Sequence, residues 1–436
     1  MPNGSERDLD LVLWGATGYT GRLVARYLAE RLSGRAANGS VRVSWALGGR
    51  DLAKLEALRA ELAELDPAAR ELPLLTGDSL DPATLEPIVR RARVVCTTVG
   101  PYSRYGTPLA RLCAELGTDS CDLSGEVSWM RRTVDELHEP ARASGARIVH
   151  CCGFDSIPSD LGTLLLHRAL EDQGSGLRRA HLRVRSMRGK ASGGTVASLF
   201  EIAGEARRDP EARRVLLDPY ALNPPGERPP LEGGPDRGDS LRPRLDADRG
   251  VWTAPFLMAM INTRVVRRSN ALLGYPYGRD FRYDERVDTG RGLRGRLRAR
   301  AVASAIAAFT GAAALRPTAW LLRRFVLPDP GEGPSAAERE RGGFRIRIFG
   351  EGRPAPESGL VRNAVVTVAA DRDPGYGATA GMLAESALAL VAGWRPAAAG
   401  DARGAGGVLT PASALGLPLI ERLARAGVRF EAEAVS

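Results

Sequence analysis

Short apolar runs alternate with segments of helical length along the N-terminal part of this 436-residue chain. A short, continuous apolar run bounded by turn residues is typical of a strand that is buried on both faces. The segment 19–31, by contrast, places Leu23, Val24 and Tyr27 on one side of a helix. The alternation predicts an α/β fold, in which a doubly wound, mostly parallel sheet spans residues 8–172. The six predicted strands are residues 9–14, 41–47, 72–75, 94–99, 120–123 and 147–152.

The alternation stops after Gly174, and the remaining chain predicts an α+β second domain over residues 173–436. Residues 209–250 are rich in Pro, Gly and charge and predict a long flexible loop, whereas residues 331–343 predict a polar linker. Residues 344–349 and 364–369 are expected to pair as antiparallel strands. Further strands are expected at 181–187, 279–287 and 428–434, and helices at 194–206, 297–327 (interrupted at Pro317) and 378–394.

The net charge of +9 comes almost entirely from arginine, because Lys54 and Lys190 are the only lysines. Alanine and glycine are also abundant, a combination that GC-rich coding produces, so the charge does not by itself indicate nucleic acid. No basic-aromatic module that reads bases is present, and we expect no nucleic-acid partner. The five cysteines include no Cys-x-x-Cys pair and the four histidines show no ligand spacing. We therefore expect reduced thiols, a cytoplasmic location and no metal site.

A glycine-rich turn lies between the first predicted strand and the first predicted helix, at residues 15–21. This placement is typical of the dinucleotide turn of a Rossmann fold. Gly15 would permit the tight turn, Gly18 would let the backbone approach a pyrophosphate, and Gly21 would let the helix pack against the strand. The alternative is a strand–helix turn that merely happens to use glycine. We assign to the coenzyme site Gly15, Thr17, Gly18, Tyr19, Thr20 and Gly21.

The residue after the second strand indicates which coenzyme is bound. NAD-binding proteins usually carry an acidic residue there, whereas Arg50 could hold a 2′-phosphate, with Thr17 and Tyr19 lining that pocket. The sequence thus favours NADP(H), although Arg50 could instead be a solvated surface arginine. Asp51 is interpreted as a helix cap. Asp78 is a candidate for the adenine end of the coenzyme, and a turn role is the alternative.

Three segments that mix turn residues with polar groups follow the fourth, fifth and sixth strands, at 99–106, 121–126 and 152–160. Ligands of open α/β sheets bind beyond the carboxyl ends of the strands. We expect Gly100 and Pro101 to border the coenzyme. Tyr102, Ser124 and Asp155 are the candidate catalytic residues, which would orient the substrate or move a proton.

Each of these polar residues also has a structural alternative. Asp155 and Asp160 could cap the helix that begins near Pro158, and Glu126, a further polar candidate, could belong to the first turn of a helix. No tyrosine is followed by lysine four positions later, so the Tyr-x-x-x-Lys pair of short-chain reductases is absent from the sequence.

Several motifs together resemble the saccharopine dehydrogenase-like oxidoreductase family, and in particular its branch of trans-acting enoyl reductases from bacterial lipid and polyketide assembly. They are Gly-Ala-Thr-Gly-Tyr-Thr-Gly at 15–21, Gly-Gly-Arg at 48–50, Val-Gly-Pro-Tyr at 99–102, Asp-Leu-Ser-Gly-Glu at 122–126 and Gly-Phe-Asp-Ser-Ile-Pro-Ser-Asp at 153–160. Ser-Gly-Gly-Thr at 192–195 and Gly-Val-Leu-Thr-Pro-Ala-Ser at 407–413 extend the resemblance nearly to the end of the chain.

The resemblance implies NADPH-dependent reduction of a carbon–carbon double bond in an enoyl thioester, with an acyl carrier protein or a polyketide synthase as partner. Two alternatives stay open at this point. One is an NADP-binding regulatory protein without turnover. The other is an imine or amino-acid dehydrogenase of the saccharopine type, which would need a cationic substrate pocket.

An apolar stretch at residues 301–315 has arginines on both sides, within 294–324. It is too short to span a bilayer, which needs about 20 residues. Three interpretations remain: an alanine-rich core helix, a wall of an acyl pocket, or a peripheral contact with the inner face of the membrane.

Overall fold

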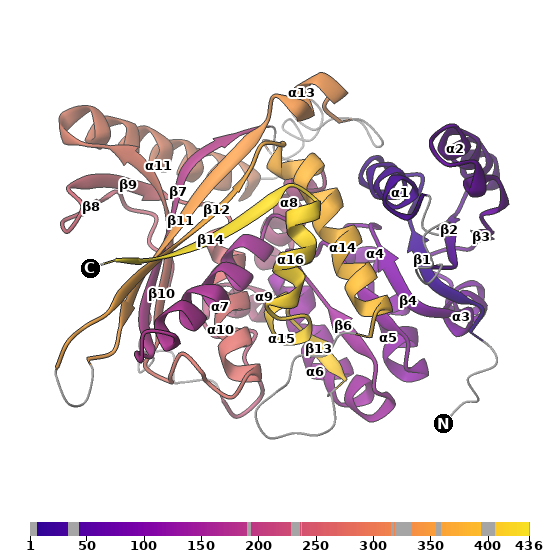
Figure 1. Ribbon diagram of the computed structural model, residues 1–436, viewed down its shortest axis with the longest axis horizontal. Coiled ribbons are helices and arrows are strands. Elements are labelled where there is room, and N and C mark those ends of the chain that lie inside the picture. Colours follow the sequence, from indigo (N-terminus) through magenta and orange to yellow (C-terminus); the bar gives the residue numbers. More distant parts are fainter. Residues whose placement is uncertain are drawn as a thin grey trace.

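The computed structural model describes residues 7–33, 43–189, 193–227, 236, 238–314, 318, 333–354, 359–393 and 406–435. Two sheets organise these residues, one at each end of the molecule, with helices between and around them (Figure 1).

The first sheet is parallel throughout, and its strand order is β13-β6-β5-β4-β1-β2-β3. The order 3-2-1-4-5-6 within it is that of a doubly wound dinucleotide-binding sheet, which confirms the predicted fold class. Its strands are β1 (Leu9–Trp14), β2 (Trp45–Gly49), β3 (Leu74–Thr76), β4 (Ala92–Thr97), β5 (Asp119–Cys121), β6 (Arg147–Val149) and β13 (Gly407–Leu409). The helices that connect them are α1 (Tyr19–Leu32), α2 (Leu52–Leu65), α3 (Pro82–Arg91), α4 (Tyr102–Tyr105), α5 (Thr107–Leu116), α6 (Val127–Ser144) and α7 (Ile157–Glu171).

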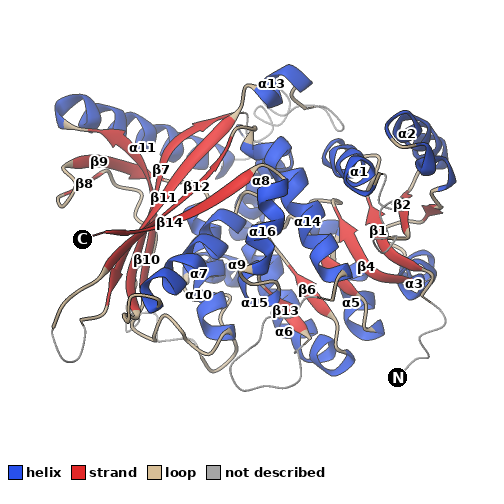
Figure 2. Cartoon of the chain, in the orientation of Figure 1, coloured by secondary structure: helices blue, strands red, loops and turns tan. Residues whose placement is uncertain are grey.

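Strand β13 comes from the C-terminal part of the chain and was not predicted as a strand. It lies beside β6 (Figure 2), and Val408 pairs with Ile148 of that strand. The buried guanidinium of Arg268 donates a hydrogen bond to the Val408 carbonyl, and His138 accepts one from the Val408 N–H at 3.2 Å. The predicted domain boundary at residue 172 therefore does not separate the two sheets, because the chain returns to the first sheet at β13.

The second sheet is mixed, with the order β14-β12-β11-β7-β10-β9-β8. Strands β7 and β10 are parallel, and every other recorded pair is antiparallel, including the predicted pair β11 and β12. This arrangement confirms the predicted α+β class. The strands are β7 (Leu177–Arg188), β8 (Arg244–Asp246), β9 (Val251–Pro255), β10 (Arg282–Gly290), β11 (Gly343–Gly352), β12 (Asn363–Ala370) and β14 (Val428–Val435). The helices are α8 (Gly193–Arg208), α9 (Pro210–Leu217), α10 (Ala259–Leu272), α11 (Gly292–Ala314), α13 (Ala336–Glu340), α14 (Thr379–Val391), α15 (Pro411–Ala414) and α16 (Pro418–Arg425).

Two segments that were predicted as loop or linker contain short elements. Helix α9 lies within 209–250, where Asp209 caps its N-terminus by accepting a hydrogen bond from the Glu211 N–H at 2.8 Å. Helix α13 lies within 331–343 and begins with a capping box of Ser335 and Glu338. Such short helices escape a search for apolar periodicity, because the caps carry most of their sequence signal. The expected break at Pro317 lies outside the described residues.

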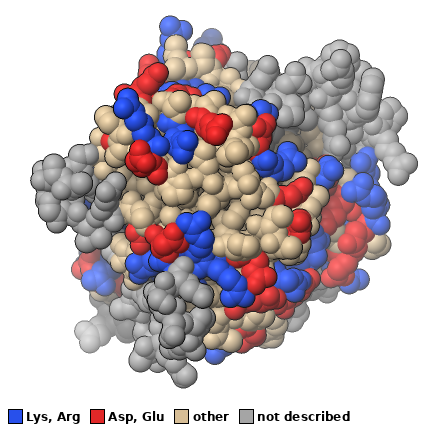
Figure 3. Space-filling view, turned by 90° about the vertical axis from the view of Figure 1, so that its right-hand side faces the viewer, with Lys and Arg blue, Asp and Glu red and all other residues tan. Residues whose placement is uncertain are grey.

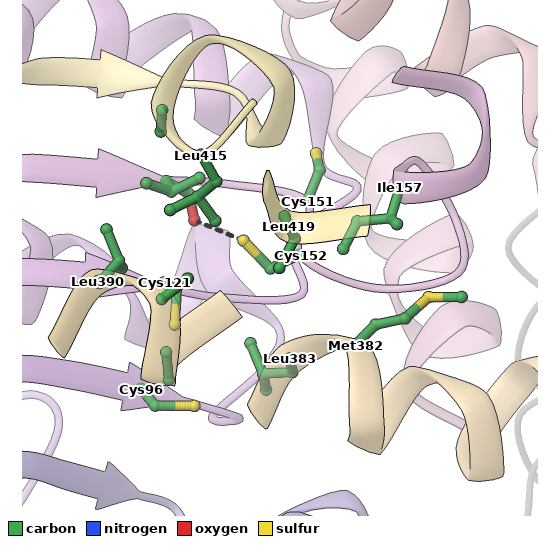
Figure 4. Close-up of a cluster of buried hydrophobic side chains, with 14 of the residues drawn as sticks. Cys96, Cys121, Cys151, Cys152, Ile157, Met382, Leu383, Leu390, Leu415 and Leu419 are labelled. Atoms are coloured by element: carbon green, nitrogen blue, oxygen red, sulfur yellow. Dashed lines mark hydrogen bonds between the residues drawn. The ribbon is translucent and has the colours of Figure 1, made fainter. Parts of the chain in front are cut away.

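Helix α14 joins the two parts of the molecule, because it packs on α1 and on one face of the first sheet. The buried Glu385 of this helix forms ion pairs with Arg31 of α1 at 2.8 Å and with Arg422 of α16 at 2.9 Å. Met382 and Leu383 belong to a buried cluster that also contains Cys96 and Cys121 of the first sheet (Figure 4). Removing one partner of a buried ion pair is costly, so this cluster holds the second domain against the first.

Charged side chains of both signs are interspersed on the surface at the end of the molecule that carries the first sheet (Figure 3). Ion pairs between α1 and α2 contribute to this pattern, since Glu61 binds Arg22 at 2.5 Å and Arg26 at 2.7 Å. These exposed pairs add little stability individually.

Candidate active site

The glycine turn between β1 and α1 has room for backbone only. Gly15 has a φ of +85°, and a Cβ there would lie 2.6 Å from the Val99 side chain. A Cβ on Gly21 would lie 2.1 Å from the Gly15 carbonyl oxygen. Gly18 is exposed, and a Cβ on it would meet only the Gly15 oxygen, at 3.4 Å. The turn is therefore tight on its inner side and open on its outer side, which is the shape of a diphosphate cradle.

The start of helix α1 is also electrostatically suited to an anion. Gly18 is the N-cap, no side chain among the described residues caps the helix, and its first turn holds no acidic residue. The free N–H groups and the helix dipole favour a phosphate at this point. Thr20, in the same turn, lines the cavity described below. These residues fit a dinucleotide.

Arg50 follows β2 and is exposed; within the described part of the chain it forms no hydrogen bond or ion pair. Thr17 lies close by, because its Oγ1 would be 3.6 Å from a Cβ on Gly49. Asp51 caps α2, as predicted, by accepting a hydrogen bond from the Lys54 N–H at 3.1 Å. Asp78 makes a turn contact, since its carboxylate accepts a hydrogen bond from the Leu80 N–H at 2.9 Å, and its role toward a coenzyme stays a prediction.

Tyr19 faces the second domain. Its hydroxyl donates a hydrogen bond to the Pro334 carbonyl and accepts one from Arg339 at 2.7 Å. Its ring meets that of Tyr376 edge-on, with 4.7 Å between centroids. Residues 333–342 thus dock beside the glycine turn, a contact for which the sequence holds no signal. The role of Tyr19 toward a coenzyme stays a prediction.

The three polar segments after β4, β5 and β6 meet, as expected, around one cavity at the carboxyl ends of the strands. Six of the predicted site residues line this cavity: Thr20, Gly100, Pro101, Tyr102, Ser124 and Asp155. The second domain closes the cavity from the other side with Ala197, Ser198, Ile202, Met258, Ile261, Gly375 and Thr379. The cavity is therefore an interdomain site, to which a substrate and the reactive end of a coenzyme would both have access.

Tyr102 is buried, and both hydrogen-bonding capacities of its hydroxyl are used. The hydroxyl donates to the Thr97 carbonyl at 3.2 Å and accepts from the Leu123 N–H at 3.1 Å. Burial raises the pKa of Tyr102 well above its ordinary value. The hydroxyl thus braces the segment after β5, and we do not assign it the transfer of a proton.

Glu126 lies immediately before α6, but its side chain binds the N-terminal end of α4. Its carboxylate accepts hydrogen bonds from the N–H groups of Tyr102 at 2.7 Å and Ser103 at 2.9 Å, and from the Ser198 hydroxyl at 3.1 Å. These bonds satisfy free donors at the start of α4 and tie them to α8 of the second domain. Glu126 is consequently a residue that positions the cavity wall.

Ser124 is buried at the edge of the cavity and is held by a polar cluster behind it. Its Oγ accepts a hydrogen bond from the Glu126 N–H at 3.3 Å, and its own N–H donates to Asp122 at 2.9 Å. Asp122 also contacts Nδ1 of the buried His150 at 2.6 Å. Sequence reasoning missed His150, because nothing in its spacing links it to Asp122.

Cys151 lies under the same segment in a left-handed conformation, with a φ of +65°. Its thiol donates a hydrogen bond to the Ser124 carbonyl at 2.9 Å, and burial raises the pKa of the thiol well above its ordinary value. A thiol of this kind is a poor nucleophile. Within the described residues, no group of His, Cys, Asp and Glu side chains could hold a metal ion.

Asp155 differs from its neighbours, because its half-buried carboxyl lines the cavity and receives no hydrogen bond from any described residue. Burial raises its pKa to about 6. It does not cap α7, whose N-cap is Ser156. Asp160 does not cap that helix either, since its carboxylate accepts hydrogen bonds from the Ala412 N–H at 2.8 Å and from the Ser269 hydroxyl. A partly desolvated, unbonded carboxyl in a cavity is suited to hold and release a proton.

A second, larger cavity of ≈ 1070 Å³ lies within the second domain, and none of the predicted catalytic or coenzyme residues lines it. Ile306 and Thr310 of α11 form part of its wall. The segment 256–261 contributes to the walls of both cavities. Met258 and Ile261 line the first cavity, whereas Phe256 and Met260 line the second.

Comparison with known proteins shows which family the chain belongs to. No family model matches it. A trans-acting enoyl reductase of Mycobacterium ulcerans is 40% identical over 437 residues and covers 98% of each chain. One of Mycobacterium bovis is 41% identical over 434 residues, or 97% of each chain. A protein of Mycobacterium tuberculosis, provisionally described with the same activity, is 44% identical over 438 residues, or 98% of this chain and 97% of its own.

Among solved structures, saccharopine dehydrogenase (L-Glu forming) of Saccharomyces cerevisiae superposes with a TM-score of 0.52 at 13% identity, over 98% of this chain and 100% of that one. This match shows that the fold is saccharopine dehydrogenase-like. Together with the trans-acting enoyl reductases above, it defines the class: the chain is an oxidoreductase with that fold. More narrowly, it belongs to the family of trans-acting enoyl reductases. A reductase with a nucleotide-binding fold implies a nicotinamide coenzyme.

Proposed function

We propose that the protein is an NADPH-dependent reductase that saturates the C=C bond of an enoyl thioester, with the Asp155 carboxyl as the proton donor. The observation that carries the proposal is the free carboxyl of Asp155, which lines an interdomain cavity just beyond the glycine turn. Membership of a trans-acting enoyl reductase family supports the reaction class.

The chain offers binding groups for both phosphate positions of NADPH. The uncapped start of α1 and the open side of Gly18 would hold the diphosphate. Arg50, with Thr17 beside it, would hold the 2′-phosphate through charge-assisted hydrogen bonds. Gly100 and Pro101 border the cavity where the reactive end would lie. When bound, the coenzyme supplies the hydride for the substrate's β-carbon.

The pKa of Asp155 suits it to donate the proton that the α-carbon of the substrate needs. With a pKa of about 6, roughly a tenth of its carboxyl groups carry a proton at neutral pH, and a larger fraction does so in a cavity closed by substrate. A general acid works best when its pKa lies near the working pH. The protonated carboxyl would deliver its proton to the α-carbon of the substrate, and bulk water would then restore it.

The rest of the cavity wall supports an apolar substrate. Phe154, Ile202 and Met258 line it, together with Leu123 and Ile261. No lysine or arginine is found among the described residues of this lining. A saccharopine-type or other amino-acid substrate would need a cationic partner for its carboxylates, so the enoyl thioester is the better fit.

The test is oxidation of NADPH by the purified protein with a panel of enoyl thioesters, carried on N-acetylcysteamine, on coenzyme A and on an acyl carrier protein. We expect turnover with at least one of them and a preference for the carrier-bound form, since the family acts in trans. Asp155→Asn should keep NADPH affinity and lose turnover. Tight NADPH binding without oxidation on the whole panel would instead favour the regulatory alternative.

A further inference from the structure

Helix α11 lies at the end of the molecule opposite the first sheet (Figure 1). It packs on β9 and β10 through its inner face, where Gly295 and Ala299 are buried. A Cβ on Gly295 would lie 2.2 Å from the Gly290 carbonyl oxygen, so this contact is very close. The helix is nevertheless not a core helix, one of the alternatives that the sequence left open, because its other face is exposed.

The exposed face forms an apolar and small-residue stripe along the helix. Leu293 is 70% exposed and Leu297 is 54% exposed. Ala301, Ser304 and Ala308 continue the stripe at helical spacing and are also exposed. Two large apolar side chains thus lie one helical turn apart on the same exposed face, and contiguous apolar surface of this kind marks contact sites more often than single exposed leucines do.

Exposed arginines flank this stripe on both sides. They are Arg291, Arg294, Arg296, Arg298 and Arg300. Helical spacing puts Arg296 and Arg300 on one side of the stripe and Arg294 and Arg298 on the other. None of the five forms an ion pair with a described residue, and the helix contains no aspartate or glutamate. The net charge of this surface is therefore uncompensated within the described chain.

We propose that α11 is an interfacial helix that binds the surface of an anionic lipid bilayer. Leu293 and Leu297 would enter the boundary between headgroups and acyl chains, and the flanking arginines would bind lipid phosphates. The helix would lie in the plane of the membrane, since none of the helices in the described ranges has both the length and the apolar character to cross one. A second copy of the chain fits less well, because two such helices would bring arginines against arginines with no acid to pair them.

Vesicle co-sedimentation of the full-length protein tests this proposal independently of its catalytic activity. Phosphatidylcholine vesicles are compared with vesicles of phosphatidylcholine and phosphatidylglycerol. We expect binding to the anionic vesicles only, weakened by added salt. The triple variant Arg294→Gln, Arg298→Gln, Arg300→Gln should reduce the partition coefficient about tenfold or more. Its charge-matched control removes three exposed arginines elsewhere (Arg70→Gln, Arg142→Gln, Arg425→Gln) and should bind as the wild type does.

A second pair of variants tests the apolar stripe. Leu293→Asp with Leu297→Asp should also release the protein from anionic vesicles, whereas Leu80→Asp, at another exposed leucine, should not. Unchanged thermal unfolding would show that the variants fold. The proposal is overturned if the wild type ignores anionic vesicles, or if both α11 variants bind them normally. It is also overturned if the variants only convert a dimer to a monomer on a sizing column.

Discussion

The carboxylate of Glu126 accepts a hydrogen bond from the Tyr102 N–H at 2.7 Å, and this contact joins the segments that follow β4 and β5. A second bond to the Ser103 N–H and a third from Ser198 extend the contact to the second domain. The wall of the candidate active site is thus held by a buried carboxylate that has no free oxygen to offer a substrate.

Replacing Glu126 by alanine should therefore act on stability. The buried N–H of Tyr102 and the partly buried N–H of Ser103 would lose a charged acceptor, and we expect the free energy of unfolding to fall by about 2–3 kcal/mol. Urea denaturation followed by circular dichroism measures this change. Glu115→Ala, which removes an exposed glutamate of α5, serves as the control and should change stability by less than about 0.5 kcal/mol. Equal effects of the two variants would contradict the bracing role.

Asp155 predicts a pH dependence of turnover. Because the protonated carboxyl is the reactive form and its pKa is about 6, kcat/KM should fall as pH rises above that value, approaching tenfold per pH unit. Asp155→Asn should lower kcat by about 100-fold or more and flatten the profile. Tyr102→Phe is the matched comparison, since its hydroxyl is occupied by backbone groups, and it should keep kcat within about threefold. A larger loss in Tyr102→Phe than in Asp155→Asn would reverse the assignment.

The raised pKa of Asp155 also predicts that Asp155→Asn stabilises the folded protein. Its pKa is raised in the folded protein, from 3.8 to about 6, so the folded state binds the proton more tightly than the unfolded state does. The resulting stabilisation is complete below pH 4 or so and is lost as pH rises through about 6. At neutral pH, Asp155→Asn should therefore be more stable than the wild type by about 3 kcal/mol, and below about pH 4 the difference should vanish. Thermal unfolding across this pH range measures both.

Arg50 predicts the choice between the two nicotinamide coenzymes. Arg50→Ala should weaken NADPH binding by about 10- to 100-fold, because a charged hydrogen-bonding partner of the 2′-phosphate is removed. NADH, which lacks that phosphate, should bind with nearly unchanged affinity. Fluorescence titration with both coenzymes gives the ratio. An unchanged ratio would mean that Arg50 is merely a solvated surface arginine.

The glycine turn should not tolerate a methyl group at its tightest point. A Cβ on Gly21 would lie 2.1 Å from the Gly15 oxygen, so Gly21→Ala must move either the helix or the turn. We expect loss of detectable binding of both coenzymes and a clear loss of stability. Gly204→Ala in α8 is the control, because the nearest atom to its new Cβ would be 3.7 Å away in a flexible side chain. That control should be neutral or slightly stabilising.

Elements whose signals are local could be predicted from the amino-acid sequence. Alternating apolar runs and helical segments predicted the parallel sheet, and glycine spacing predicted the tight turn at residues 15–21. The rule that ligands bind beyond strand ends predicted which three segments would meet, and they do meet in one cavity.

Which contacts each polar side chain in that cavity makes follows only from the tertiary structure. Tyr102 and Asp155 are equivalent candidates in the sequence, but two backbone groups bind the tyrosine hydroxyl, whereas no group in the described part of the chain binds the carboxyl. Likewise, Asp160 binds the N–H of Ala412, and β13 joins the first sheet from near the end of the chain. Such contacts join residues that lie far apart in sequence, and hydrogen-bond satisfaction and burial depend on all the atoms around a group, which no local pattern encodes.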